Sequence, residues 1–317
     1  MHPKRFVPTV GLAIEFIAAL ALIVSPGIPQ TLRAQQTAAS TGARSGDWSA
    51  VEQILGRKGA VSAGGVVRFS FPRSDLQVMV ADVQLKPALA LGGWVAFKPV
   101  ANGRAMAAGD LVLTTDEVGP VMQRLQAGGI SQTAVHNHLL GENPRVMYMH
   151  IMAEGAATKL AETLRSALGE SKTPLAIAAP AAPNTVIDLD TVAVARALGY
   201  TGKVNGGVYQ VSVPRAERIV DMGAEIPPAM GVATAINFQP TGGGKAAITG
   251  DFVLLGNEVN PVLRTLRENG IQVTAVHSHM LHESPRLLFM HFWANDDATK
   301  LATALHAALG RTNSKRS

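Results

Sequence analysis

Two segments of the chain repeat each other, so the fold must contain the same structural unit twice. The segment TAVHNHLLGENPRVMYMH ends at His150, and TAVHSHMLHESPRLLFMH ends at His291. Matching residues keep a constant offset, as in the step from 136 to 277. A chain of 317 residues is long enough for two domains of ordinary size. The sequence therefore predicts two copies of one structural unit.

The two copies share the histidines, glutamate and arginine of this segment, although many core positions have changed. Apolar positions have changed, since Val146 matches Leu287 and Tyr148 matches Phe289. Core residues are interchangeable, whereas side chains that bind a ligand are not. The pattern therefore points to a site for a metal or an anionic ligand. The shared polar residues are His136, His138, Glu142, Arg145 and His150, matched by His277, His279, Glu283, Arg286 and His291.

The composition allows a buried core and excludes several classes of partner. Hydrophobic residues make up 47% of the chain and charged residues 16%, so wholesale disorder is not expected. The formal net charge is +5, but no cluster of Lys and Arg is interleaved with aromatic residues, which argues against a nucleic-acid partner. The chain has no cysteine, so disulfides, thiolate ligands and a lipid anchor on cysteine are all excluded.

The first 34 residues resemble a secretory signal peptide. Lys4 and Arg5 give a basic start, and 6–24 is mostly apolar. A retained membrane anchor is the alternative, because the apolar stretch is close to spanning length. The polar segment that follows favours cleavage near Ala34. We therefore predict a bacterial protein that is periplasmic or secreted, with no stable membrane span after cleavage.

The remaining chain divides into two units joined by a segment rich in Ala and Pro, which has no amphipathic period. The predicted segments are a flexible leader at 35–46, unit one at 47–170, the Ala/Pro linker at 171–184, unit two at 185–310 and a basic tail at 311–317.

Each unit repeats the same order of predicted elements. Alternating apolar residues predict strands, and apolar residues three and four apart predict helices that end at glycine. We expect an α+β fold, each unit being a mostly antiparallel sheet with helices on one face. Two similar half-buried sheets should cover each other as an intramolecular pseudo-dimer. In unit one the helices are predicted at 51–55, 117–126 and 156–168, and strands at 66–73, 94–99 and 109–114; the counterparts are 192–198, 258–268 and 297–309, and 208–215, 235–240 and 250–255.

The histidine spacing predicts a metal site. His136 and His138 are two residues apart on a strand, so they share a face and lie roughly 6.6 Å apart at the backbone. His150 on the return strand joins them if it lies opposite His136, with Glu142 near the turn. Three imidazoles and a carboxylate suit a divalent metal, zinc first, with iron, manganese, nickel or copper as alternatives. His277, His279 and His291 are the matching ligands, in one site per repeat or one composite site.

The other shared polar residues have two readings each. Glu142 and Glu283 are candidate ligands or general bases. Arg145 and Arg286 are candidates to clamp an anionic substrate, or else to pair with those glutamates. The rival readings for the whole pattern are a non-catalytic envelope protein that binds a metal or small anion, and a structural repeat without metal. An enzyme requires an open coordination position and a pocket, whereas a carrier predicts saturated coordination.

Three further features are interpreted as structural. Methionines crowd the histidine segments and would suit copper, but alternation places Met149 and Met290 on the face opposite the histidines, which favours core packing. Asp110 and Asp251 follow Gly where a strand is expected to begin. They are read as turn residues in preference to hydrogen-bond partners that orient an imidazole. Arg73 is expected to have a structural role.

These residues resemble a family of exported bacterial proteins named after the lipoproteins LppY and LpqO. The resemblance rests on the LG-x-x-G start, the F-P-R strand end and the TAVH-x-H, E-x-P-R and MH motifs, and it covers nearly the whole chain after 34 in two copies. It implies an envelope location and no particular activity. The chain departs from the lipoproteins in having no cysteine for acylation.

Overall fold

The computed structural model describes 47–176 and 186–316. The predicted signal peptide at 1–34, the leader at 35–46 and most of the predicted linker lie outside the described residues. The described residues belong to one compact unit. Among the described helices, none combines the length and the apolar character needed to cross a membrane.

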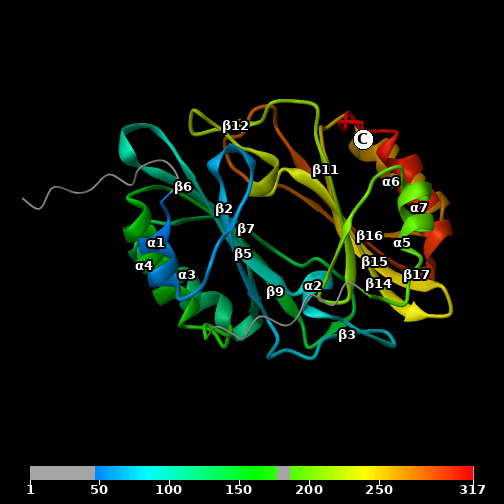
Figure 1. The fold of residues 1–317 in the computed structure, drawn as a ribbon, viewed down its shortest axis with the longest axis horizontal. Helices are drawn as coiled ribbons and strands as arrows, with labels where there is room; N and C mark the ends of the chain where they lie inside the picture. Colours follow the sequence, from blue (N-terminus) through cyan, green and yellow to red (C-terminus); the bar gives the residue numbers. More distant parts are fainter. Residues whose placement is uncertain (1–46, 177–185, 317) are drawn as a thin grey trace, which may run out of the picture. The chain divides into compact units, whose positions relative to one another are not determined.

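The first repeat contains a six-stranded antiparallel sheet with helices against it (Figure 1). Its strands run in the order β1 (Ala60–Val61), β2 (Val67–Pro72), β5 (Gly92–Pro99), β6 (Ala105–Thr114), β9 (Val146–Gly155) and β7 (Ser131–His136). Its three main helices are α1 (Ser49–Leu55), α3 (Thr115–Ala127) and α4 (Ala157–Leu168).

The second repeat has the same architecture, which confirms the predicted α+β class with two repeated units. Its strands run in the order β10 (Lys203–Asn205), β11 (Val208–Pro214), β14 (Ala233–Gly242), β15 (Lys245–Leu254), β17 (Leu288–Asp297) and β16 (Gln272–His277). Its helices are α5 (Thr191–Leu198), α6 (Val259–Glu268) and α7 (Ala298–Leu309).

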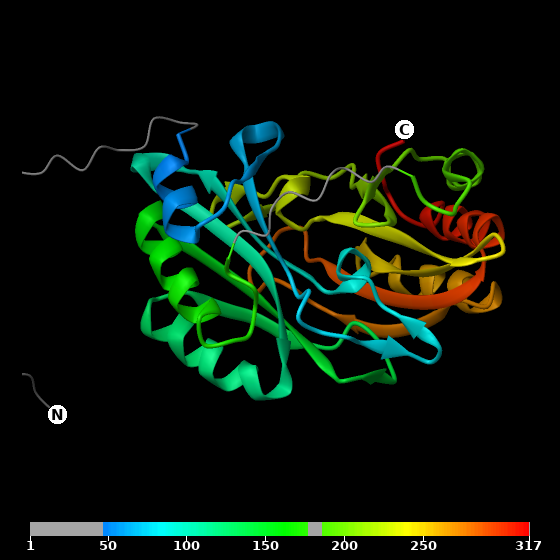
Figure 2. The same ribbon diagram turned by 60° about the horizontal axis from the view of Figure 1, so that its bottom comes forward.

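Several short elements lie between these strands. In particular, β8 (Glu142–Asn143) pairs with β3 (Met79–Val80), so the stretch that was expected to be a tight turn is part of a small three-stranded sheet (Figure 2). The other short elements are η1 (Ala63–Gly65), β4 (Val83–Gln84), α2 (Pro87–Ala90), η2 (Ala101–Gly103), β12 (Val220–Asp221), β13 (Ala224–Glu225) and η3 (Pro228–Met230).

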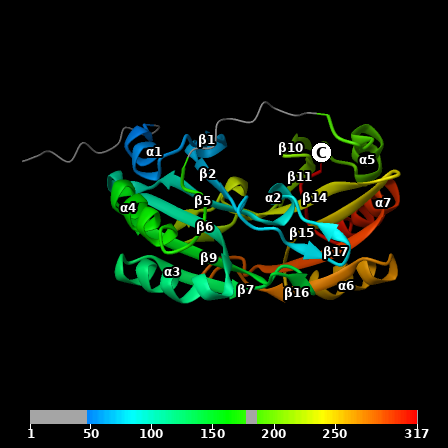
Figure 3. The same cartoon turned by 90° about the horizontal axis from the view of Figure 1, so that it is seen from below.

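The two sheets face each other, and the main helices lie on their outer faces (Figure 3). Along β9, Met149 and Ile151 pack in the core beneath the helices, whereas Tyr148 and Met152 pack between the sheets. This alternation is what a strand buried on both faces requires. The inter-sheet clusters contain residues of both repeats, and they flank the histidines.

A buried arginine joins strand and helix in each repeat. The guanidinium of Arg73 donates to the Val112 carbonyl at 2.8 Å, to Glu117 at 2.6 Å and to Asp75 at 2.9 Å. Arg215 makes the matching contacts in the second repeat. Full burial of an arginine is tolerated only with such complete pairing. The structural role expected for Arg73 agrees with these contacts.

A candidate metal centre between the two sheets

The hairpin of β7 and β9 brings three histidines to one face of the first sheet. His136 lies opposite Tyr148, and Ala134 lies opposite His150. The expected pairing of His136 with His150 is therefore wrong by two residues. Because the shift is even, the histidines keep the same face. The register also slips between Gln132 and Ala134, a bulge that the sequence pattern did not indicate.

The second hairpin repeats this geometry and meets the first. The ring centroids of His136 and His277 lie 3.7 Å apart, those of His138 and His291 3.9 Å, and those of His150 and His279 3.6 Å. His136 and His277 are equivalent residues, and the other two pairs exchange under an approximate two-fold axis. The six histidines thus form one composite cluster, which we call the histidine centre.

The histidine centre is largely withdrawn from solvent. His150, His279 and His291 are buried, and the other three are partly buried. In the part of the chain that the structure describes, the Nε2 atom of each of the six imidazoles is buried and has no hydrogen-bond partner. Six such nitrogens in one place are unusual, because buried polar atoms are nearly always paired.

Two aspartates that were interpreted as turn residues lie beside the histidine centre. Asp110 pairs in register with His150, and Asp251 with His291. Both sit in the middle of long strands, so their interpretation as turn residues is wrong. A carboxylate oxygen of Asp110 lies 3.9 Å from His138 Nε2, and the other lies 3.7 Å from His150 Nε2. The Oδ1 atoms of both aspartates are buried without a hydrogen bond among the described residues.

Burial controls the ionisation of these carboxyl groups. It raises the pKa of Asp110 to about 7, against an opposing effect of the Arg68 charge. Burial also raises the pKa of Asp251 well above its usual range, and the nearby charge of Asp110 adds to this. The charge of Asp110 thus acts on Asp251, so the two carboxyl groups lie close enough to interact.

The imidazoles are held in their neutral form. Burial lowers the pKa of His136 to about 4 and that of His277 to about 3. Burial lowers the pKa of the other four well below the usual value, and neighbouring imidazoles add to the effect. A neutral imidazole offers a lone pair, which is the form that binds metal.

The proton position on one imidazole follows from its neighbour. The Nδ1–H of His291 donates to the Gly250 carbonyl at 2.9 Å, which leaves the lone pair on Nε2. Aromatic rings stack on two other imidazoles of the centre. Tyr148 stacks on His138 at 3.3 Å, and Phe289 stacks on His279 at 3.6 Å.

The predicted glutamates do not belong to the groups of converging ligand atoms, which contain only histidines. Glu283 is buried and accepts from the Leu287 amide at 2.9 Å and from Arg286 at 3.2 Å. The carboxylate oxygens of Glu142 are buried without a hydrogen bond among the described residues, and burial raises its pKa.

The predicted arginines lie at the surface. Arg286 pairs with Glu283, as one of the two readings expected, and also donates to the carbonyls of Met280 and Leu281. Arg145 is exposed, and within the described ranges it forms no ion pair with Glu142. Neither arginine contacts a histidine of the centre in the described part of the chain.

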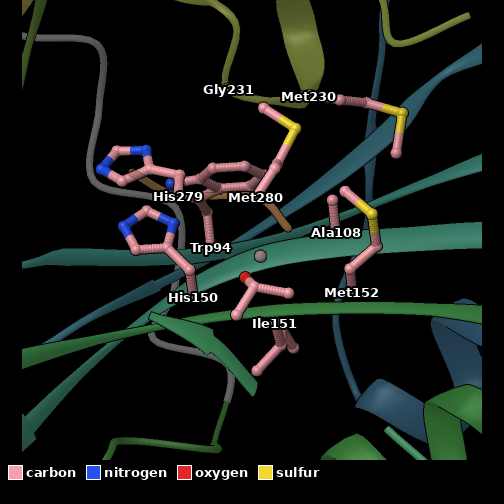
Figure 4. A pocket seen from close by; sticks show the side chains of 11 residues that line it. Trp94, Ala108, His150, Ile151, Met152, Met230, Gly231, His279 and Met280 are labelled. Carbon is pink, nitrogen blue, oxygen red and sulfur yellow. The ribbon is translucent and has the colours of Figure 1, made fainter. Parts of the chain in front are cut away.

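A small cavity of about 20 Å³ adjoins the histidine centre at His150 and His279 (Figure 4). Its walls are mostly apolar, and Met152, Met230 and Met280 point toward it. A volume of this size holds one water molecule. Met149 and Met290 instead pack beneath the helices, as expected from alternation.

Comparison with known sequences supplies the family. Residues 49–170 and 192–311 each match the model of the Domain of Unknown Function (DUF1259). The chain belongs to this family. It therefore contains two tandem copies of one domain, as the repeat indicates. No curated protein sequence matches the chain.

Two solved structures show a distant likeness. One is a trimeric bacterial microcompartment shell protein, PduB, at 12% identity and a TM-score of 0.22, covering 80% of this chain and 89% of that chain. The other is EtuB from Clostridium kluyveri, at 8% identity and a TM-score of 0.18, covering 79% of this chain and 90% of that chain. At such TM-scores the likeness has no bearing on function.

Proposed function

We propose that this protein binds a divalent transition metal in the histidine centre, with ligands from both repeats. The observation that supports this is the set of six buried Nε2 atoms, all without a hydrogen-bond partner in the described residues. Leaving one buried acceptor unpaired costs roughly 1–3 kcal/mol. A metal ion would satisfy several of these atoms at once.

The donor chemistry favours a cation of borderline softness. Neutral imidazoles with carboxylates nearby suit zinc, and also iron, manganese, nickel or copper in the divalent state. Six imidazoles in the neutral form offer an anion little electrostatic attraction, so a small anion is a poorer fit. The structural reading of the histidines is also weaker, because these nitrogens make no hydrogen bonds that would stabilise a polar core.

The surroundings favour a metal-binding protein over an enzyme acting on a small anion. The adjoining cavity of about 20 Å³ has no room for a substrate, and Arg286 is committed to Glu283 and two carbonyls. A metal-dependent enzyme remains the second candidate. It is favoured by Glu142, whose buried carboxylate is free of hydrogen bonds in the described residues and so could accept a proton.

The cellular setting is part of the proposal. The basic start and apolar run within 1–34 support export to the periplasm or the medium. The shared motifs support a relationship to the LppY/LpqO proteins, within the family to which the chain belongs.

Metal content tests the proposed function. Protein without a histidine tag is purified and analysed by elemental mass spectrometry, beside the double variant His136→Ala/His277→Ala. The control is His282→Ala, which removes an exposed histidine of the same segment. We expect metal in the wild type and the control and none in the double variant. A wild type that takes up none of the offered divalent metals would overturn the proposal.

A further inference from the structure

The buried donor atoms outnumber the ligands of one metal ion. Among the described residues, six Nε2 atoms and the Oδ1 atoms of Asp110 and Asp251 are all buried without a hydrogen bond. A transition metal ion in a protein takes about four to six ligands. One ion would therefore leave at least two of these atoms without a partner.

The donor atoms fall into two groups. The ligand atoms of one group lie within 4.8 Å of one another, and so do those of the second, with His136 common to both. Each group has a carboxylate beside it. Asp251 lies 3.7 Å from His279 of the first group, and Asp110 lies 3.9 Å from His138 and 3.7 Å from His150 of the second. The first group is His136, His277, His279 and His291; the second is His136, His138 and His150.

We propose that the histidine centre holds two divalent ions in unlike positions. One ion occupies the position of the four imidazoles of the first group, which completes a tetrahedral shell. The other is bound by His138, His150 and Asp110. Two imidazoles and one carboxylate leave coordination positions open, so this ion exchanges more readily. The inference rests on the proposed metal-binding function.

The two aspartates differ in how they face their histidines. Asp110 lies next to the Nε2 atoms of both His138 and His150, and these nitrogens are free to bind metal. One carboxylate oxygen of Asp251 lies 3.7 Å from Nε2 of His279. The other lies 3.8 Å from Nδ1 of His291, whose proton is donated to Gly250, so Asp251 faces one free Nε2 atom where Asp110 faces two. Asp110 is therefore assigned as a ligand, whereas Asp251 is a neighbour of the four-histidine position.

The surroundings of the two positions also differ. On the side of the first repeat, Glu142 has no ion pair with Arg145 among the described residues, and Tyr148 stacks on His138. On the other side, Glu283 is held by Arg286 and a backbone amide. The cavity is lined by His150 of the second group and by His279 of the first, and it has room for one water molecule to complete the shell of an incompletely ligated ion.

The number of bound ions tests this inference. Metal-free full-length protein without a tag is titrated with Co²⁺ alone, passed through gel filtration and analysed for cobalt. The wild type should hold two ions per chain and Asp110→Asn one. The matched control, Asp251→Asn, should still hold two. The first equivalent should give the intense visible absorption of tetrahedral Co²⁺, and the second a weaker band.

The outcomes separate the two proposals. No bound cobalt in the wild type overturns the proposed function itself. One bound ion, or an equal loss in Asp110→Asn and Asp251→Asn, overturns only the two-ion assignment. Thermal melting of each variant verifies folding. If Asp110→Asn is unfolded, His138→Gln is judged by the same criterion, with His282→Gln as its control.

Discussion

Asp110 illustrates what a single residue reveals only in its structural context. It follows Gly109, and that pair was read as a turn. The strand in fact begins at Ala105, and Leu111 packs beneath the helices while Asp110 faces the other sheet. The apolar run at 105–108, which precedes Gly109, could have indicated that the strand begins earlier. The pairing with His150 could not have been predicted, because it depends on which strands are neighbours.

The second repeat has Phe289 where the first has Tyr148, so the two residues can be compared directly. We expect Tyr148→Phe to keep the stacking on His138 and to lose only the hydroxyl hydrogen bond to the Ala90 carbonyl. The free energy of unfolding should fall by about 1 kcal/mol. Tyr148→Ala also removes a buried ring and should cost about 3–5 kcal/mol. Urea unfolding of both variants measures this, and equal losses would contradict the argument.

At the scale of elements, the sequence predicts long amphipathic helices better than short strands. The helix predicted at 117–126 is observed as Thr115–Ala127, where a capping box of Thr114 and Glu117 marks its beginning. The strands and helix between 79 and 90 were missed, since their two- to four-residue lengths carry no period. The histidine face was predicted, but the register was not. The connection from β7 to β9 contains β8, which pairs with β3, and a bulge between Gln132 and Ala134 shifts the register further along the strand.

The ion pair between Arg73, which follows β2, and Glu117 of α3 should make the free energy of unfolding depend on pH. Burial opposes ionisation of Glu117, but hydrogen bonds from Arg73 and two backbone amides outweigh it, so its pKa lies below the usual 4.5. A carboxylate with a lowered pKa stabilises the fold above pH 4.5, and this contribution is lost as pH falls through the folded-state pKa.

We therefore expect Glu117→Gln to be less stable than the wild type at neutral pH and to lose less stability on acidification. Urea midpoints at neutral pH and below pH 4.5 measure the difference. The exposed Glu162→Gln is the control and should behave like the wild type. Parallel acid profiles for the wild type and Glu117→Gln would show that Glu117 plays no part.

At the scale of the whole molecule, the centre depends on how the repeats pack together. The sequence indicated that there are two units and that each has histidines on one face. It could not decide between separate sites and one composite site, because no periodicity encodes the packing of one sheet on another. The geometry is that of one composite cluster, because the pairs His138–His291 and His150–His279 each contain one ring from each repeat.

Polar contacts between the repeats should matter for stability. Gln239 of β14 is buried, accepts from the Lys86 amide and donates to the Gln84 carbonyl, both at 2.8 Å. Gln239→Ala leaves both groups without this partner, and we expect a loss of about 1–3 kcal/mol in urea unfolding. Gln123→Ala, on an exposed helix face, should change stability by less than about 0.5 kcal/mol. Similar losses in both variants would contradict a role for the contact.

Metal should stabilise the folded chain through both repeats at once. Zinc at about 100 times its dissociation constant raises the free energy of unfolding by about 2.7 kcal/mol per site. Thermal melting with and without zinc should show this as a higher Tm, and chelation should reverse it. His136→Ala/His277→Ala should show no such shift. A zinc-dependent Tm in that variant would place the binding elsewhere.

The exchange of ring pairs across the approximate two-fold axis bears on how such a centre can arise. A single repeat associated with a copy of itself would assemble the same six histidines, because each pair takes its partner from the other half. An exact homodimer must keep both halves identical. Joining the halves in one chain removes that requirement. Tyr148 corresponds to Phe289 and Leu139 corresponds to Met280, and a homodimer of one repeat could not carry these differences. Gene fusion thus allows one symmetric cluster of histidines to acquire two distinct sides.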